Sequence, residues 1–192
     1  PAQCPTCGSK EVQSKTPPNR RNANNGNFVV METSKGTIEI ELNRGRAPGT
    51  VKNFVDYTND GFFNGLCFHR VIRGFMIQGG GFTPAGQHKD GRDPIQIESR
   101  NGLKNARGTI AMARTNDPDS ASSQFFINTA DNANLDYPNP DGHGYTVFGK
   151  VISGLEVVDE IERASTWTKM SQHGPMQDWP SEEICIDKVS MK

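Results

Sequence analysis

The chain has 192 residues, 33% of them hydrophobic, and a formal net charge of −1. This length suits one globular domain with a short extension. The sequence has no basic stripe of the kind that nucleic-acid-binding proteins carry, so it predicts no nucleic-acid partner. No run of 18 apolar residues occurs, so the sequence predicts no membrane-spanning helix and no membrane partner. Four cysteines in a chain of this size do not indicate a disulfide framework. The cysteine pattern therefore predicts a reducing, cytoplasmic setting.

Residues 1–27 differ in composition from the rest of the chain. Residues 1–13 carry the pair Cys4-Pro-Thr-Cys7, and residues 14–27 contain no large apolar side chain. The second stretch cannot bury enough surface to offset its ordering entropy, so we interpret it as a flexible linker. The main domain is predicted to occupy residues 28–192.

The cysteine pair in this tail has two interpretations that the sequence leaves open. Two thiolates held by a tight turn resemble half of a zinc knuckle. Cys4 and Cys7 would then bind a structural zinc ion that is shared between two chains or completed by His88 or His173. In the other interpretation the tail is disordered and both thiols are free.

The first elements of the main domain form a predicted hairpin. Residues 28–31 are apolar, and residues 37–42 alternate strictly between apolar and polar side chains, which is typical of a half-buried strand. Residues 34–36, Ser-Lys-Gly, are typical of the turn between two such strands.

Two segments have helical periodicity. Residues 48–59 repeat apolar side chains at helical spacing, with a proline at the start and a glycine just past the end. Residues 154–163 follow Ser153 and place Glu156 three positions after it, a pattern that predicts a capping box. The predicted buried stripe of this second helix consists of Leu155, Val158 and Ile161.

The other apolar runs are short and favour strands. They cover residues 67–72, 75–78, 95–97, 109–113, 125–128, 145–151 and 184–189. Many antiparallel strands with two helices favour a closed barrel, because closure removes exposed sheet edges, and the helices would cover its ends. Residues 132–144, rich in Gly, Asp and Pro, are predicted to form a long surface loop. Cys67 and Cys185 fall in predicted strands and are interpreted as small core residues.

Motifs for covalent, phosphate or metal chemistry are incomplete in the main domain. Residues 81–88 have the spacing of a phosphate-binding loop but lack its lysine and Ser/Thr. No Gly-x-Ser-x-Gly elbow occurs, which leaves serine hydrolysis without a visible nucleophile. The four histidines are scattered, so the sequence predicts no catalytic metal and no cofactor for catalysis. These absences favour a function that works by binding and polarising a substrate.

An arginine and a glutamine lie within two neighbouring apolar runs. On an extended strand, Arg70 shares a face with Phe68 and Ile72. Gln78 likewise shares a face with Met76. Arg70 either lies at an edge and covers apolar surface with its stem, or it reaches over an apolar pocket in which Gln78 is the second polar group, as in a ligand site.

Three ordered blocks carry a family pattern. They are residues 68–82, with the sequence Phe-His-Arg-Val-Ile-Arg-Gly-Phe-Met-Ile-Gln-Gly-Gly-Gly-Phe, then residues 108–114 with 123–127, and residues 145–151. Together they resemble the signatures of the cyclophilin family of peptidyl-prolyl cis–trans isomerases. The resemblance extends from about residue 29 to residue 189, and residues 112–115 and 177–180 are most similar to bacterial members.

The resemblance implies a mainly β fold, a closed eight-stranded antiparallel β-barrel capped by two α-helices, and isomerisation of X–Pro bonds. It implies that Arg70 and Gln78 are catalytic, with Gln78 as a polar partner of the substrate backbone. The implied proline pocket consists of Phe75, Met76, Phe126 and Leu135, and the implied groove for the preceding residue consists of Ala113, Arg114, Thr115 and Gln124. Tyr145 replaces a histidine of many eukaryotic members, and Asn134 replaces a familiar tryptophan.

A second class of function fits the same fold. The alternative is a catalytically idle proline-peptide-binding, chaperone or scaffolding module. Such members would be expected to lose the arginine, glutamine and phenylalanine that Arg70, Gln78 and Phe126 match. The sequence therefore favours the enzyme. Its expected partners are proline-containing peptides and unfolded or folding proteins, its expected state is a monomer, and its expected cyclosporin binding is weak.

Overall fold

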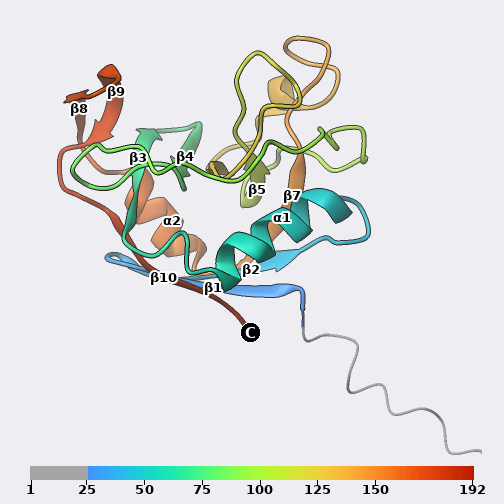
Figure 1. The fold of residues 1–192 in the computed structure, drawn as a ribbon, viewed down its shortest axis with the longest axis horizontal. Helices are drawn as coiled ribbons and strands as arrows, with labels where there is room; N and C mark the ends of the chain where they lie inside the picture. Colours follow the sequence, from blue (N-terminus) through green and yellow to red (C-terminus); the bar gives the residue numbers. More distant parts are fainter. Residues whose placement is uncertain (1–25) are drawn as a thin grey trace, which may run out of the picture.

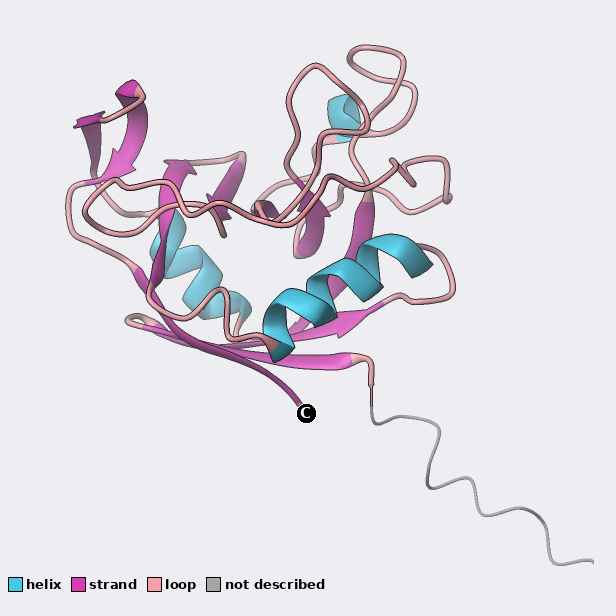
Figure 2. Ribbon diagram, in the orientation of Figure 1, coloured by secondary structure: helices cyan, strands magenta, loops and turns pink. Residues whose placement is uncertain are grey.

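The computed structural model describes residues 26–192 (Figures 1 and 2). In chain order the elements are β1 Phe28–Thr33, β2 Gly36–Leu42, α1 Pro48–Asn59, β3 Leu66–Ile72, β4 Met76–Gly79, β5 Thr109–Met112, β6 Phe125–Asn128, the 3₁₀ turn η2 Ala133–Leu135, β7 Val147–Ser153, α2 Leu155–Glu162, β8 Thr166–Ser171, β9 Gly174–Pro180 and β10 Cys185–Met191. None of the helices in this range is long and apolar enough to cross a bilayer. The predicted tail, residues 1–13, and nearly all of the predicted linker, residues 14–27, lie outside the described residues.

Eight strands close into one antiparallel barrel in the order β1-β10-β3-β4-β6-β5-β7-β2. This confirms the predicted fold. The interior is filled by large apolar side chains, and the Phe54 ring contacts the rings of Phe63, Phe125 and Phe148. Apolar residues of α1 and α2 belong to the same buried cluster, so the two helices cover the barrel and complete its core (Figure 2).

The first helix has the predicted bounds, but its N-terminus is capped from a distance. Ala47 provides no side-chain cap. Instead, the carboxylate of Glu98 accepts hydrogen bonds from the Thr50 amide (2.5 Å), the Thr50 hydroxyl (2.8 Å) and the Gly49 amide (3.3 Å). A carboxylate at this end also interacts favourably with the helix dipole. The loop that carries Glu98 is therefore fixed to α1.

The capping box predicted for the second helix is wrong. The N-cap is Gly154, with φ of +86°, and it has no side-chain cap, while Ser153 is still part of β7. A Cβ at Gly154 would collide with the Thr37 carbonyl of β2, so the chain must leave the strand in a conformation that suits glycine. Val158 and Ile161 are buried as predicted, but Val157 is buried in place of Leu155, which is half-buried.

Two predictions about strands also need correction. Residues 95–97 form no strand: Ile95 makes an isolated bridge with Ala121, and the Ile97 amide donates to the Asp119 carboxylate instead of a ladder. The β8–β9 hairpin was not predicted, because the β8 side chains are exposed or half-buried and therefore give no apolar run. Of the two strand cysteines, Cys67 is buried and Cys185, directly opposite it, is half-buried.

Candidate active site

Four neighbouring strands place four residues in one row on the outer face of the barrel. Arg70 of β3 pairs with Gln78 of β4, Gln78 pairs with Phe126 of β6, and Phe126 pairs with Ala111 of β5. Residues directly opposite in a ladder point to the same face of the sheet. Arg70 and Gln78 are therefore neighbours beside the Phe126 ring.

A β-bulge brings Arg70 to this outer face. Between Phe68 and Arg70 the register with β4 shifts, because Phe68 pairs with Gly79 and Arg70 with Gln78. His69 is thus the extra residue, and the extra residue reverses the alternation of the strand. Phe68 packs in the barrel core, so the prediction that it shares a face with Arg70 is wrong.

Nine of the eleven predicted site residues line one cavity of about 140 Å³. They are Arg70, Phe75, Met76, Gln78, Ala113, Arg114, Phe126, Leu135 and Tyr145. Met76, Phe126 and Leu135 are buried, whereas the Arg70 side chain is 47% exposed at the rim. An apolar floor with an arginine and a glutamine at its edge is the arrangement expected of a small ligand site.

The two remaining residues lie beside the cavity. Gln124 accepts a hydrogen bond from Gln78, Nε2 to Oε1 at 3.0 Å, which fixes the Gln78 amide. A Cβ at Gly81 would lie 2.6 Å from the Gln124 side chain, so glycine at that position allows Gln124 to approach. Thr115 is exposed and its hydroxyl pairs with Ser120 (2.8 Å).

Arg114 contributes a buried wall, and its guanidinium is already engaged. Its side chain is 2% exposed and forms an ion pair with Asp141 (2.8 Å). It also donates to the Gly144 and Thr115 carbonyls, and it stacks on the Tyr145 ring, 4.4 Å from the centroid. The pairing holds the pKa of the Asp141 carboxyl below its usual value, chiefly through the hydrogen bond from Arg114. Arg114 therefore ties two loops together at the pocket edge.

A buried amide network holds the loop that carries Leu135. Asn128 donates to Asn105 (3.1 Å), and Asn132 donates to Asn128 (2.8 Å) and to the Phe75 carbonyl (2.8 Å). Asn105 also donates to Asp136 (3.1 Å). Buried amides must find such partners to avoid a desolvation cost. This network was not predicted from the sequence, because Phe75 and Asn105 are far in the chain from Asn128 and Asn132 and only the polarity of these residues within or beside buried segments hints at it.

His69 is a poor candidate for proton transfer. It is buried against Phe82 and Trp179, and burial lowers its pKa to about 3. The imidazole is therefore neutral at physiological pH and cannot act as a general acid there. The site has the groups for binding and polarisation rather than for acid–base catalysis.

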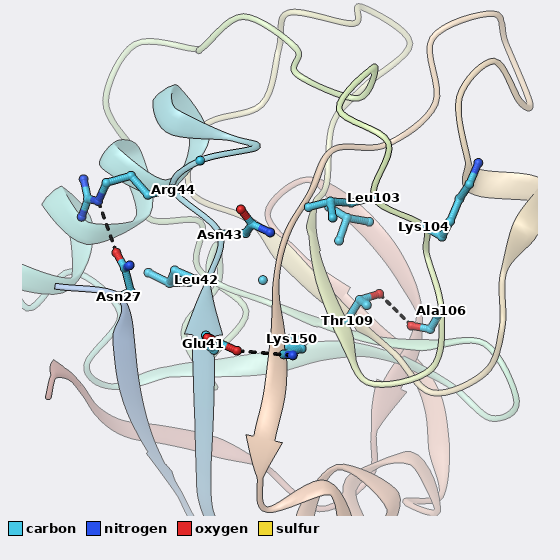
Figure 3. A pocket seen from close by; sticks show the side chains of 13 residues that line it. Asn27, Glu41, Leu42, Asn43, Arg44, Leu103, Lys104, Ala106, Thr109 and Lys150 are labelled. Carbon is cyan, nitrogen blue, oxygen red and sulfur yellow. Dashed lines mark hydrogen bonds and ion pairs between the residues drawn. The ribbon is translucent and has the colours of Figure 1, made fainter. Parts of the chain in front are cut away.

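A larger cavity, about 580 Å³, lies elsewhere between β2, β7 and the loop of residues 103–106 (Figure 3). Four of its charged and polar side chains pair with one another: Lys150 with Glu41 (3.4 Å) and Arg44 with Asn27 (3.4 Å). It contains none of the predicted site residues. The smaller cavity beside Arg70 is therefore the better candidate for the active site.

In residues 26–192 no cluster of three or more His, Cys, Asp or Glu side chains is arranged to hold a metal ion. Cys4 and Cys7 lie outside the described residues. In the described part of the chain, the candidate site is therefore a binding pocket that consists of an arginine, a glutamine and an apolar floor.

Comparison with known proteins identifies this arrangement. The family model described as cyclophilin type peptidyl-prolyl cis-trans isomerase/CLD matches residues 28–191. Peptidyl-prolyl cis-trans isomerase A of Dickeya dadantii is 51% identical over 169 residues, which cover 88% of this chain and 86% of that protein. Peptidyl-prolyl cis-trans isomerase B of Escherichia coli is 48% identical over 166 residues, covering 85% of this chain and 99% of that protein.

A solved structure gives the same result. The Cryptosporidium parvum cyclophilin-type isomerase, crystallised in the presence of the dipeptide Ala-Pro, superposes with a TM-score of 0.72 at 29% identity and covers 86% of this chain and 98% of its own. The barrel with its outer pocket thus defines a class of proline-directed isomerases. The chain belongs to the cyclophilin-type peptidyl-prolyl cis–trans isomerase family and has bacterial relatives at about half identity.

Proposed function

We propose that Arg70 accelerates rotation about X–Pro bonds by stabilising the twisted transition state. The uncatalysed barrier is about 18–20 kcal/mol, since rotation removes amide resonance, and spontaneous exchange takes tens to hundreds of seconds. An acceleration of about 10⁵ requires roughly 7 kcal/mol of preferential binding to the transition state. No bond breaks, so neither a nucleophile nor a cofactor is required.

The guanidinium suits this task because its contact strengthens as the bond twists. In the twisted state the prolyl nitrogen becomes pyramidal and gains a lone pair, to which Arg70 donates a hydrogen bond. The planar amide offers almost no such acceptor. A hydrogen bond made mainly in the transition state lowers the barrier, whereas one made equally in the ground state does not.

The pocket holds the ring while the preceding carbonyl rotates. Met76, Phe126 and Leu135 form a buried apolar floor, which excludes water and strengthens the Arg70 hydrogen bond. In this proposal Gln78 binds the substrate backbone, and the hydrogen bond that fixes its amide to Gln124 supports that role. The single observation that carries this proposal is the row Arg70–Gln78–Phe126 across three strands.

The test is Arg70→Ala, which should lower kcat/KM for a short X-Pro peptide at least about tenfold. Arg70→Lys should remain impaired, because an ammonium lacks the planar fork. Turnover is measured by NMR exchange, and thermal unfolding serves as the control for folding. A folded Arg70→Ala variant with full turnover would contradict the role of Arg70, and a wild type without turnover would favour the idle binding module.

The substrates we propose are proline-containing peptides and unfolded or folding proteins, taken up by a monomer in the cytoplasm. The first part is supported by the solved relative that was crystallised with Ala-Pro. An open pocket rim, with Arg70 47% exposed, allows a longer chain to pass on either side of the proline. Refolding of a proline-limited protein substrate, with and without the enzyme, tests this range.

We also propose that Cys4 and Cys7 bind a structural zinc ion, either shared between two chains or completed within one chain by His88 or His173. The proposal is supported by His88 and His173, whose rings lie 5.8 Å apart between centroids. Asp90 is 3.1 Å from His88 Nδ1, a partner that leaves Nε2 free for a metal. Under reducing conditions the intact protein should contain at least about one zinc per two chains. His88→Ala should lower this content for a site completed by His88 and leave it unchanged for a site shared between two chains, and His143→Ala should leave it unchanged in both cases. A lower content in the wild type indicates free thiols.

A further inference from the structure

The β8–β9 hairpin contains a bulge whose extra residue has an unusual conformation. Trp179 pairs with Trp167 and Met176 with Lys169, so two residues of β9, Gln177 and Asp178, oppose one residue of β8. Asp178 has φ of +59° and is the one non-glycine residue with positive φ in the described range 26–192. Aspartate tolerates this region better than most residues, but glycine adopts it at lower cost.

The bulge directs the Asp178 carboxylate toward the active-site arginine. Oδ2 of Asp178 lies 4.0 Å from Nε of Arg70, and the two side chains are 39% and 47% exposed. Bulges often redirect a side chain next to an active site. No other ion pair or hydrogen bond engages the Arg70 guanidinium among the residues that the structure describes.

The hairpin is anchored firmly enough to hold this carboxylate in place. Trp179, the next residue, is 2% exposed and packs with Cys67 of β3 and with Phe82. Lys169 of β8 covers the Trp179 ring, 4.8 Å from its centroid. Strand β9 therefore lies along β3, the strand that carries Arg70 (Figure 1).

We propose that Asp178 is a positioning residue for Arg70, an inference that rests on the proposed function of Arg70. The carboxylate attracts the Nε side of the guanidinium and leaves the two terminal nitrogens available to the substrate. A long arginine side chain at an open rim otherwise samples several rotamers. The bulge supplies the charge that restricts them, and the unfavourable φ of Asp178 is retained for this purpose.

Asp178→Asn removes the charge but keeps the size and the tolerance of positive φ. It should lower kcat for a short X-Pro peptide about two- to fivefold, the range expected for an exposed ion pair, with KM unchanged. The difference from wild type should shrink as ionic strength rises, because salt screens the pair. The matched control is Glu182→Gln, which removes the same charge from an exposed carboxylate paired with Lys35 and should leave kcat unchanged. Equal turnover of Asp178→Asn and wild type at low salt overturns the proposal.

A double-mutant cycle separates this role from a general effect on the hairpin. In the Arg70→Ala background, Asp178→Asn should have no further effect, because the group that it positions is gone. A full additional loss in that background overturns the positioning role while leaving the role of Arg70 intact. An Arg70→Ala variant with normal turnover is a different result, since it removes the proposed function itself.

Asp178→Gly provides a second variant that does not depend on the asparagine. It relieves the positive-φ strain and should raise the thermal midpoint, yet it should lose turnover as Asp178→Asn does. A glycine variant that is both more stable and fully active shows that the aspartate serves no purpose at Arg70.

Discussion

Phe125 and Phe126 are adjacent in β6 and face opposite sides of the barrel wall. Phe125 is fully buried and its ring contacts Phe54, Phe63 and Phe68 in the closed interior. Phe126 is 5% exposed and belongs to a smaller cluster that leaves a cavity beside Arg70. Successive side chains of a strand point to opposite faces. In β6, one of the two phenylalanines therefore stabilises the core and the other lines the pocket.

The change with the largest expected effect removes the Phe125 ring from the core face of β6. Phe125→Ala should lower the free energy of unfolding by about 3–5 kcal/mol, since a closed core cannot collapse around the lost ring. Urea denaturation followed by circular dichroism measures the change. Activity per folded molecule should be largely retained, because Phe125 does not line the pocket.

Phe126→Ala is the matched change on the other face of the strand. Its stability loss should be smaller, about 2 kcal/mol, because the pocket is open and the lost burial leaves no enclosed void. Its kcat/KM should nevertheless fall at least about tenfold, since the proline ring loses the floor on which it packs. Equal stability losses in the two variants would contradict the division between the two faces.

The smallest expected effect on the fold comes from the exposed rim of the pocket. Asn134 lies in η2, next to buried Leu135, and is itself exposed. We expect weaker cyclosporin binding than in eukaryotic cyclophilins, where the resemblance places a tryptophan at this position. A loss of about 50–80 Å² of apolar contact corresponds to about 1.5–2 kcal/mol, or ten- to thirtyfold in affinity.

Asn134→Trp should recover this affinity without changing stability or peptide turnover. Cyclosporin titration of both proteins, read by turnover of an X-Pro peptide, measures the difference. Nanomolar inhibition of the wild type, with no gain in the tryptophan variant, would contradict the role assigned to Asn134. Tyr145 is the second departure at this rim, and its ring is fixed by Arg114 and by contact with Phe126.

Local pattern was enough for much of the fold. Strand Phe125–Asn128 and helix Pro48–Asn59 have the predicted bounds, because apolar runs and helical periodicity report burial directly. The β8–β9 hairpin escaped prediction since its β8 side chains are largely exposed. The cap of α2 was mispredicted because a close approach to β2, invisible in the local sequence, requires Gly154.

The candidate site likewise has features that the sequence predicted and features that it did not. Nine of the predicted residues surround one cavity, and they were found through motif resemblance, which depends on side-chain identity along the chain. The face of Arg70, the amide network behind Leu135 and the carboxylate of Asp178 were not found. Each depends on a bulge or on a contact between distant segments.

The sequence by itself thus determined the barrel strands, both helices, the family and the residue types at the pocket. Only the tertiary structure decided which way those residues point and what holds them there. The physical reason is that periodicity and motifs are local, whereas a one-residue bulge such as that at His69 reverses the faces of a strand. The partners of buried or strained polar groups, from Asn128 to Asp178, are set by segments that meet only when the barrel closes.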